Sequence, residues 1–137
     1  MGHTTMTRCI IARYTDASNP DHQKFLNGPS DFLYVPSDLK WVKKIKKLVR
    51  LDVSLNYLSH IDLSPLKDCT TLRYLDLSEN AIESIDLSPL EKCDKLQTLD
   101  LSYNRIRDVN LTPLVSCKSL RYVYLHRNNL DLSLIHI

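Results

Sequence analysis

The chain has 137 residues, of which 43% are hydrophobic, 25% charged and 7% aromatic, and its formal net charge is +2. This composition is typical of one modest globular domain and excludes a disordered tail. The small charge argues against a chain built wholly around nucleic acid or a membrane surface. Gly2 and Gly28 are the only glycines, which excludes the clustered glycines of phosphate-binding loops.

Residues 1–36 show no repeat and no strong periodicity, and turn signals stand at Asn19-Pro20 and at Asn27-Gly28-Pro29. We expect this segment to be disordered or to form a partial cap, with Phe32, Leu33 and Tyr34 covering the end of the segment that follows. No apolar run is long enough to span a membrane, and the start lacks the apolar region of a secretory signal.

A lysine-rich segment follows. Ser37-Asp38 can cap a helix whose apolar face carries Leu39, Val42 and Ile45. Two interpretations stay open: a solvated cap helix, or a contact for phosphates or anionic lipid. No ladder of aromatic residues accompanies the lysines as it does in single-strand binders, so a nucleic-acid partner is not expected. The lysines are Lys40, Lys43, Lys44, Lys46 and Lys47.

Four nine-residue segments then recur at a spacing of 24 residues, at 48–56, 72–80, 96–104 and 120–128. Each follows the pattern L-x-x-L-x-L-x-x-N, with Val53 and Val123 as the only exchanges for Leu. This pattern resembles the leucine-rich repeat family. The repeat domain is expected over residues 37–131, as a half-repeat followed by about four strands.

The residues themselves predict the same fold. Leu75 and Leu77 alternate with polar neighbours, which places the leucines on one face of a short strand. Ser or Thr followed by Pro favours a short helix that starts at Pro65, Pro89 or Pro113. We therefore expect an α/β solenoid, curved because helices are wider than strands, with a parallel β-sheet on the concave face and short helices on the convex face.

Asparagines and cysteines recur with the same period. Asn56, Asn80, Asn104 and Asn128 either line a site or satisfy buried backbone groups, and the resemblance implies the second role. The cysteine set comprises Cys69, Cys93 and Cys117, which we expect to be free core thiols. Because no C-x-x-C pair or zinc-finger spacing is present, neither a metal nor a cofactor is predicted.

The outward positions of the strands form the candidate contact surface, and the resemblance implies that a protein partner binds there. Asp52, Asp76 and Asp100 are either an acidic stripe for a basic partner or tolerated repeat filler. In the fourth repeat Tyr and His replace Asp and Ser, giving residue types that are enriched at binding hot spots. The candidate contact residues are Tyr74, Asp76, Glu79, Asp100, Tyr103, Tyr122, Tyr124, His126 and Arg127.

The last six residues, 132–137, depart from the repeat and read L-S-L-I-H-I. This hexapeptide is the translation of CTG TCT CTT ATA CAC ATC, a transposase-end adapter used in sequencing. We therefore expect residues 132–137 to be an adapter-derived tail on a fragment of a longer protein. A genuine apolar tail that caps the last repeat is the alternative.

The sequence predicts a non-catalytic module that binds a protein partner, because the five histidines sit in no nucleophile–base arrangement. One alternative is a regulatory segment of a truncated larger enzyme or signalling protein. Another is an adaptor that binds anionic membranes or nucleic acid through Lys40–Lys47. With free cysteines expected, the chain is placed in the cytoplasm, as a monomer unless its uncapped C-terminal end self-associates.

Overall fold

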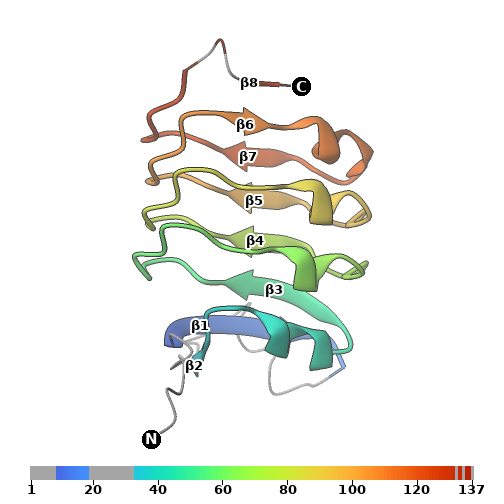
Figure 1. Cartoon of the computed structure of the whole chain (residues 1–137). Coiled ribbons are helices and arrows are strands. Elements are labelled where there is room, and N and C mark those ends of the chain that lie inside the picture. The colour runs from blue at the N-terminus through green and yellow to red at the C-terminus, as the bar shows by residue number, and fades with distance from the viewer. Residues whose placement is uncertain (1–8, 19–32, 132, 134, 137) are drawn as a thin grey trace, which may run out of the picture.

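The computed structural model describes residues 9–18, 33–131, 133 and 135–136. Its main element is a six-stranded sheet with the strand order β2-β1-β3-β4-β5-β7 (Figure 1). Four of these strands are parallel and come one from each repeat: β3 (Leu48–Asp52), β4 (Tyr74–Asp76), β5 (Thr98–Asp100) and β7 (Tyr122–Tyr124). The predicted solenoid with a parallel sheet is confirmed.

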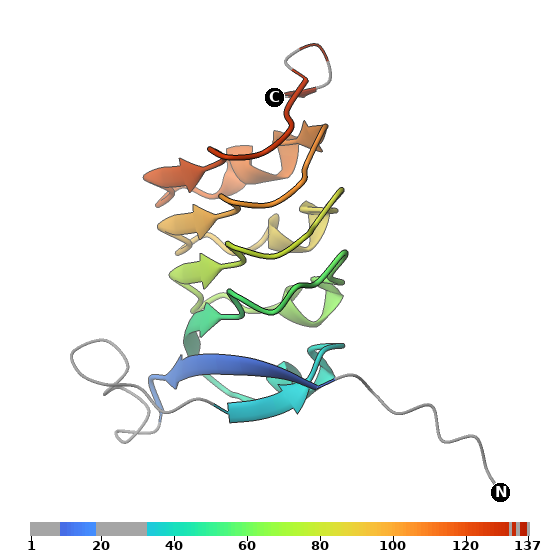
Figure 2. The same ribbon diagram turned by 90° about the vertical axis from the view of Figure 1, so that its left-hand side faces the viewer.

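The repeat spacing sets the strand register. Leu51 lies beside Leu75, Leu75 beside Leu99, and Leu99 beside Val123. Because each partner is 24 residues away, equivalent positions of successive repeats line up in rows across the sheet. The strands form one side of the stack and the return turns form the other (Figure 2).

Two antiparallel strands extend the sheet at its N-terminal end. β1 (Cys9–Asp16) pairs with β3, and β2 (Leu33–Pro36) pairs with the other edge of β1. Ile10 and Ala12 point from β1 into the core and are almost fully buried. β1 thus covers the first repeat, whereas Tyr34, which was expected to help cover it, is 79% exposed, and Phe32 lies outside the described residues.

The return turns contain 3₁₀ helices of three to five residues, which corrects the expected helix starts. They are η2 (Lys40–Lys44), η3 (Ser64–Leu66), η4 (Ser88–Leu90) and η5 (Thr112–Ser116). The last three begin one residue before the proline, and no N-cap side chain bonds to them. Instead, the side-chain oxygens of Asp62, Asp86 and Asn110 accept the backbone N–H two residues later. The cap is therefore an Asx turn, and Ser or Thr is already the first residue of the 3₁₀ turn.

Two further short strands lie beyond the main sheet. β6 (Val109–Asn110) pairs in parallel with β8 (Ile135–His136). Residues 132, 134 and 137 of the expected adapter-derived tail lie outside the described residues.

The inward leucines form one continuous core. The predicted inward face is confirmed, because Leu51, Leu75 and Leu99 are at most 1% exposed. Cys93 and Cys117 belong to this core, and Cys69 is half-buried against it. All three thiols are free, and burial raises the pKa of each, that of Cys93 to about 12. The predicted core role of the cysteine set is therefore confirmed for Cys93 and Cys117.

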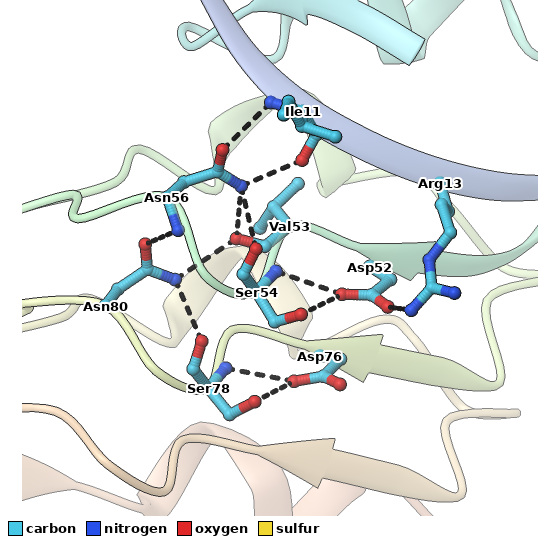
Figure 3. A network of polar contacts seen from close by, with 9 residues as sticks. All are labelled: Ile11, Arg13, Asp52, Val53, Ser54, Asn56, Asp76, Ser78 and Asn80. Atoms are coloured by element: carbon cyan, nitrogen blue, oxygen red, sulfur yellow. Dashed lines mark hydrogen bonds and ion pairs between the residues drawn. The ribbon is translucent and has the colours of Figure 1, made fainter. Parts of the chain in front are cut away.

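The asparagine amides join neighbouring repeats. Asn80 accepts hydrogen bonds from the backbone N–H groups of Asn56 and Leu58, and it donates to the carbonyls of Val53 and Leu77. Asn104 and Asn128 repeat this arrangement, and the Asn56 amide bonds to the backbone of Ile11 in β1 (Figure 3). The predicted role in satisfying backbone groups is confirmed.

Candidate functional site

The outward side chains of the parallel strands form two rows on what we call the sheet face. The first row runs Arg50, Tyr74, Thr98 and Tyr122, and the second runs Asp52, Asp76, Asp100 and Tyr124. Neighbours in a row lie on adjacent strands, which are about 4.8 Å apart. The register therefore brings together the candidate residues Tyr74, Asp76, Asp100, Tyr122 and Tyr124.

A serine two residues later fixes each aspartate of the second row. Asp76 Oδ1 accepts the backbone N–H of Ser78 at 3.0 Å and the Ser78 hydroxyl at 2.6 Å. Ser54 bonds to Asp52 and Ser102 to Asp100 in the same way. These bonds hold one oxygen of each carboxylate against the backbone, so that the other oxygen, Oδ2, carries the interaction with other groups.

Asp52 already holds a cationic partner. Its Oδ2 forms an ion pair with the guanidinium of Arg13, at 2.5 Å, and β1 places Arg13 directly beside it in the sheet (Figure 3). Asp52 is 4% exposed, so the pair is largely shielded from water on the carboxylate side. We call the three aspartates of the second row the acidic row. Its end nearest the N-terminus is therefore neutralised within the chain.

Asp76 lies in the middle of the acidic row. Burial raises the pKa of its carboxyl, and the negative charges of Asp52 and Asp100 raise it further, against the lowering effect of the Ser78 hydrogen bonds. No hydrogen bond or ion pair of the described residues reaches Oδ2 of Asp76 or Asp100. The sheet face thus carries two half-buried carboxylates that no cation in the described part of the chain pairs with.

Aromatic rings cover the fourth-repeat end of the sheet face. The Tyr122 and Tyr124 rings stack with centroids 6.0 Å apart and an interplanar angle of 5°. The His126 ring meets Tyr124 edge-on at 6.1 Å and Tyr103 edge-on at 5.4 Å. Tyr122 is 55% and Tyr103 50% exposed, so this cluster combines a fixed arrangement with a large accessible area.

Glu79, Tyr103 and Arg127 do not lie on the strands themselves. They have positive φ angles of 54°, 57° and 60°, as does Leu55 at the same repeat position. Each stands in the loop after its strand, immediately before the repeat asparagine. A left-handed conformation costs an ordinary residue about 1–2 kcal/mol. The interlocked backbone bonds, such as that from Glu79 N–H to the Ser102 carbonyl, hold this geometry in place.

Sequence reasoning missed an exposed apolar group at the other end of the sheet face. Ile11 and Tyr34 lie opposite each other on β1 and β2, and Tyr34 is 79% exposed. Ile11 and Leu55 line a hollow of about 220 Å³ above the Arg13–Asp52 pair. Residues 9–12 of β1 alternate between exposed and buried in the structure, but their sequence, Cys-Ile-Ile-Ala, carries no matching alternation of polar and apolar residues that would have revealed the strand.

The lysine-rich segment lies at the return turns, away from the sheet face. A hollow of about 470 Å³ there is lined by Lys43 of η2 and Lys46 after it, and by Lys67 and Asp68 after η3. No group of three His, Cys, Asp or Glu side chains in the described part of the chain is placed to hold a metal ion. No helix within the described ranges is long and apolar enough to cross a membrane.

Comparison with known proteins assigns the repeats. The model of the family described as leucine rich repeat matches residues 46–106 and 70–130, which together span more than half of the chain. No curated protein sequence matches the chain.

Among solved structures, 49 chains match. An internalin of Listeria monocytogenes is 32% identical over 67% of this chain, with a TM-score of 0.52. Internalin C2 of the same organism is 30% identical over 75% of this chain, with a TM-score of 0.48. The chain spans 26% of the first internalin and 45% of the second, so it is similar to a part of each.

Proposed function

Because the chain belongs to the leucine-rich repeat family, we propose that it is a non-catalytic module that binds a protein partner on the sheet face. Leucine-rich repeat domains are commonly protein-interaction modules. The chain covers only 26% of the internalin with the TM-score of 0.52, so this likeness does not identify a partner for the chain.

The observation that carries the proposal is the exposed aromatic cluster of Tyr103, Tyr122, Tyr124 and His126. Inward leucines build the core, so these outward rings are not needed for packing between repeats. Stacked and edge-on contacts restrict the rings before any partner arrives, which lowers the entropy cost of binding. Tyrosine offers large contact area together with a hydroxyl for hydrogen bonding, as binding hot spots require.

A peptide-display selection tests the proposal. We expect a random dodecapeptide library to yield binders that lose at least about tenfold in affinity when Tyr122→Thr and Tyr124→Thr are combined, since a hot spot contributes about 2 kcal/mol or more. Threonine is suited to the strand, because Thr98 occupies the position beside Tyr122 in β5. Val115→Ala is the control, since Val115 is 72% exposed in η5 on the turn side.

Unchanged affinity of every selected binder for the folded double variant would contradict the proposal. Circular dichroism melting is used to check that the double variant and the control variant are folded.

The hollow at the return turns supports a second candidate, an adaptor for anionic groups. Lys43, Lys46 and Lys67 surround it, and Asp68 is the acidic residue in its lining. Binding there would weaken steeply with salt and would be lost when these lysines are replaced by glutamine. The sheet-face proposal instead expects selected binders that are insensitive to these replacements.

A cytoplasmic location stays a prediction. The free thiols of the cysteine set are compatible with a reducing compartment.

A further inference from the structure

We infer that the sheet face recognises an arginine side chain of its partner, held between Asp76 and Asp100 and against the ring of Tyr124. The inference rests on the proposed function and names the chemistry that the partner brings.

One carboxylate of the acidic row, that of Asp52, already binds an arginine side chain within the chain. Asp52, Asp76 and Asp100 occupy the same repeat position and make the same two hydrogen bonds to a following serine. In Asp52 the remaining oxygen holds the guanidinium of Arg13, which the antiparallel strand β1 delivers from outside the repeats. Asp76 and Asp100 present the equivalent oxygen with no cationic partner among the described residues.

The charge balance favours a positively charged ligand at these two positions. Asp76 and Asp100 are paired in register on β4 and β5, so two like charges stand on neighbouring strands. Such pairs destabilise a sheet, and both carboxylates are half-buried. A cation placed between them removes the repulsion and recovers the interaction lost by desolvation.

Arginine fits better than lysine because of what stands next to Asp100. Tyr124 lies beside Asp100 in register and is 39% exposed, with its ring stacked on Tyr122. A guanidinium bonded to Asp100 therefore lies beside the Tyr124 ring. Its planar fork can donate to two carboxylates and still stack on a ring, whereas an ammonium is a compact and strongly hydrated charge.

The test uses defined probes and backbone amide chemical-shift mapping of the full chain. The probe is the tripeptide acetyl-Gly-Arg-Gly-amide. Two control tripeptides replace the arginine. Lysine keeps the positive charge in a compact ammonium group, and citrulline keeps the shape of arginine without its charge. We expect saturable shifts confined to β4, β5 and β7 with the arginine tripeptide, several-fold weaker binding of the lysine tripeptide and no binding of the citrulline tripeptide.

Matched variants separate charge from fold. Asp76→Asn combined with Asp100→Asn keeps the side-chain oxygen that accepts from Ser78 and Ser102, so the turns are preserved. This double variant is expected to bind the arginine tripeptide at least about tenfold more weakly, the loss expected for a charge-assisted hydrogen bond. Asp86→Asn is the control, because Asp86 accepts from Ser88 in the same kind of turn but lies at η4. It should leave binding unchanged.

The inference would be overturned if the Asp76→Asn, Asp100→Asn double variant bound the arginine tripeptide as tightly as the unchanged chain does. It would also be overturned if the citrulline tripeptide bound as tightly as the arginine tripeptide. The absence of shifts on β4, β5 and β7 would overturn it as well. Display-selected peptides that depend on Tyr122 and Tyr124 but contain no arginine would overturn the inference while leaving the proposed function in place. Selected peptides that are insensitive to the two tyrosines would overturn the proposed function instead.

Discussion

Replacing Asn104 by alanine tests whether the asparagine amides hold the repeats together. Asn104 is 7% exposed, and its Oδ1 accepts the Ile82 N–H at 3.1 Å. Its amide nitrogen donates to the carbonyls of Leu77, Leu101 and Ser102 at 3.0 to 3.2 Å. Two amide hydrogens serve these three carbonyls, so about three hydrogen bonds are lost in total.

At about 1 kcal/mol for each hydrogen bond, the unfolding free energy should fall by about 3 kcal/mol, a large part of the roughly 5–15 kcal/mol of a typical domain. With a urea m value of about 2 kcal/mol/M, the midpoint should move down by about 1.5 M in denaturation followed by circular dichroism.

Asn129→Ala provides the control, because Asn129 is an exposed neighbour of the repeat asparagine Asn128. Among the described residues its hydrogen bond is that of its backbone N–H to the Ile106 carbonyl, which the substitution keeps. Its effect should stay within about 0.5 kcal/mol. If Asn104→Ala were no more destabilising than Asn129→Ala, the assignment of the amides as links between repeats would be refuted.

Three further predictions concern the core, the acidic row and the thiols. Leu99→Asp should abolish the cooperative melting transition, because it places a charge without a partner at a fully buried position, and a retained transition would refute the inward assignment. Because the pKa of Asp76 is raised in the folded protein, the folded state binds the proton more tightly, and the unfolding free energy should fall as pH rises from the ordinary carboxyl pKa to the raised one. Asp76→Asn should remove this fall in urea titrations at different pH. The same pH dependence in the variant as in the unchanged chain would contradict the raised pKa of Asp76. The thiol of Cys93 should react with a disulfide reagent only after unfolding, since its pKa is about 12 and it is fully buried. Cys9 is exposed and should react in the native state. Equal reaction rates of Cys93 and Cys9 in a mass-spectrometric time course would contradict this prediction.

The repeats were predictable because their spacing determines the register. Once Leu51, Leu75 and Leu99 are aligned at intervals of 24 residues, the parallel pairing and the inward face follow. The bonding of the asparagine amides follows as well, since each strand ends beside a buried backbone that needs partners.

The N-terminal strands were not predictable from the repeat, because β1 pairs antiparallel with β3 and no repeat period extends to it. Pairing between segments this far apart in sequence depends on the complete fold. The same holds for the Arg13–Asp52 ion pair, which gives the acidic row its interpretation.

The turn details were missed for a local reason. The sequence suggested that serine caps a helix at Pro65, whereas Asp62 accepts the N–H of Ser64 and the chain forms one 3₁₀ turn. The candidate contact residues also included Glu79, Tyr103 and Arg127, each directly after an outward strand position, although a positive φ takes each of them into the following loop. Alternation is informative only while the backbone stays extended.

The footprint of a display-selected peptide on the chain, mapped by backbone amide chemical shifts, tests directly whether a partner binds on the sheet face. The shifts should gather on β4, β5 and β7, with the largest changes near Tyr122 and Tyr124. A footprint on the return turns around Lys43, Lys46 and Lys67, with the sheet face unchanged, would contradict the proposed binding on the sheet face.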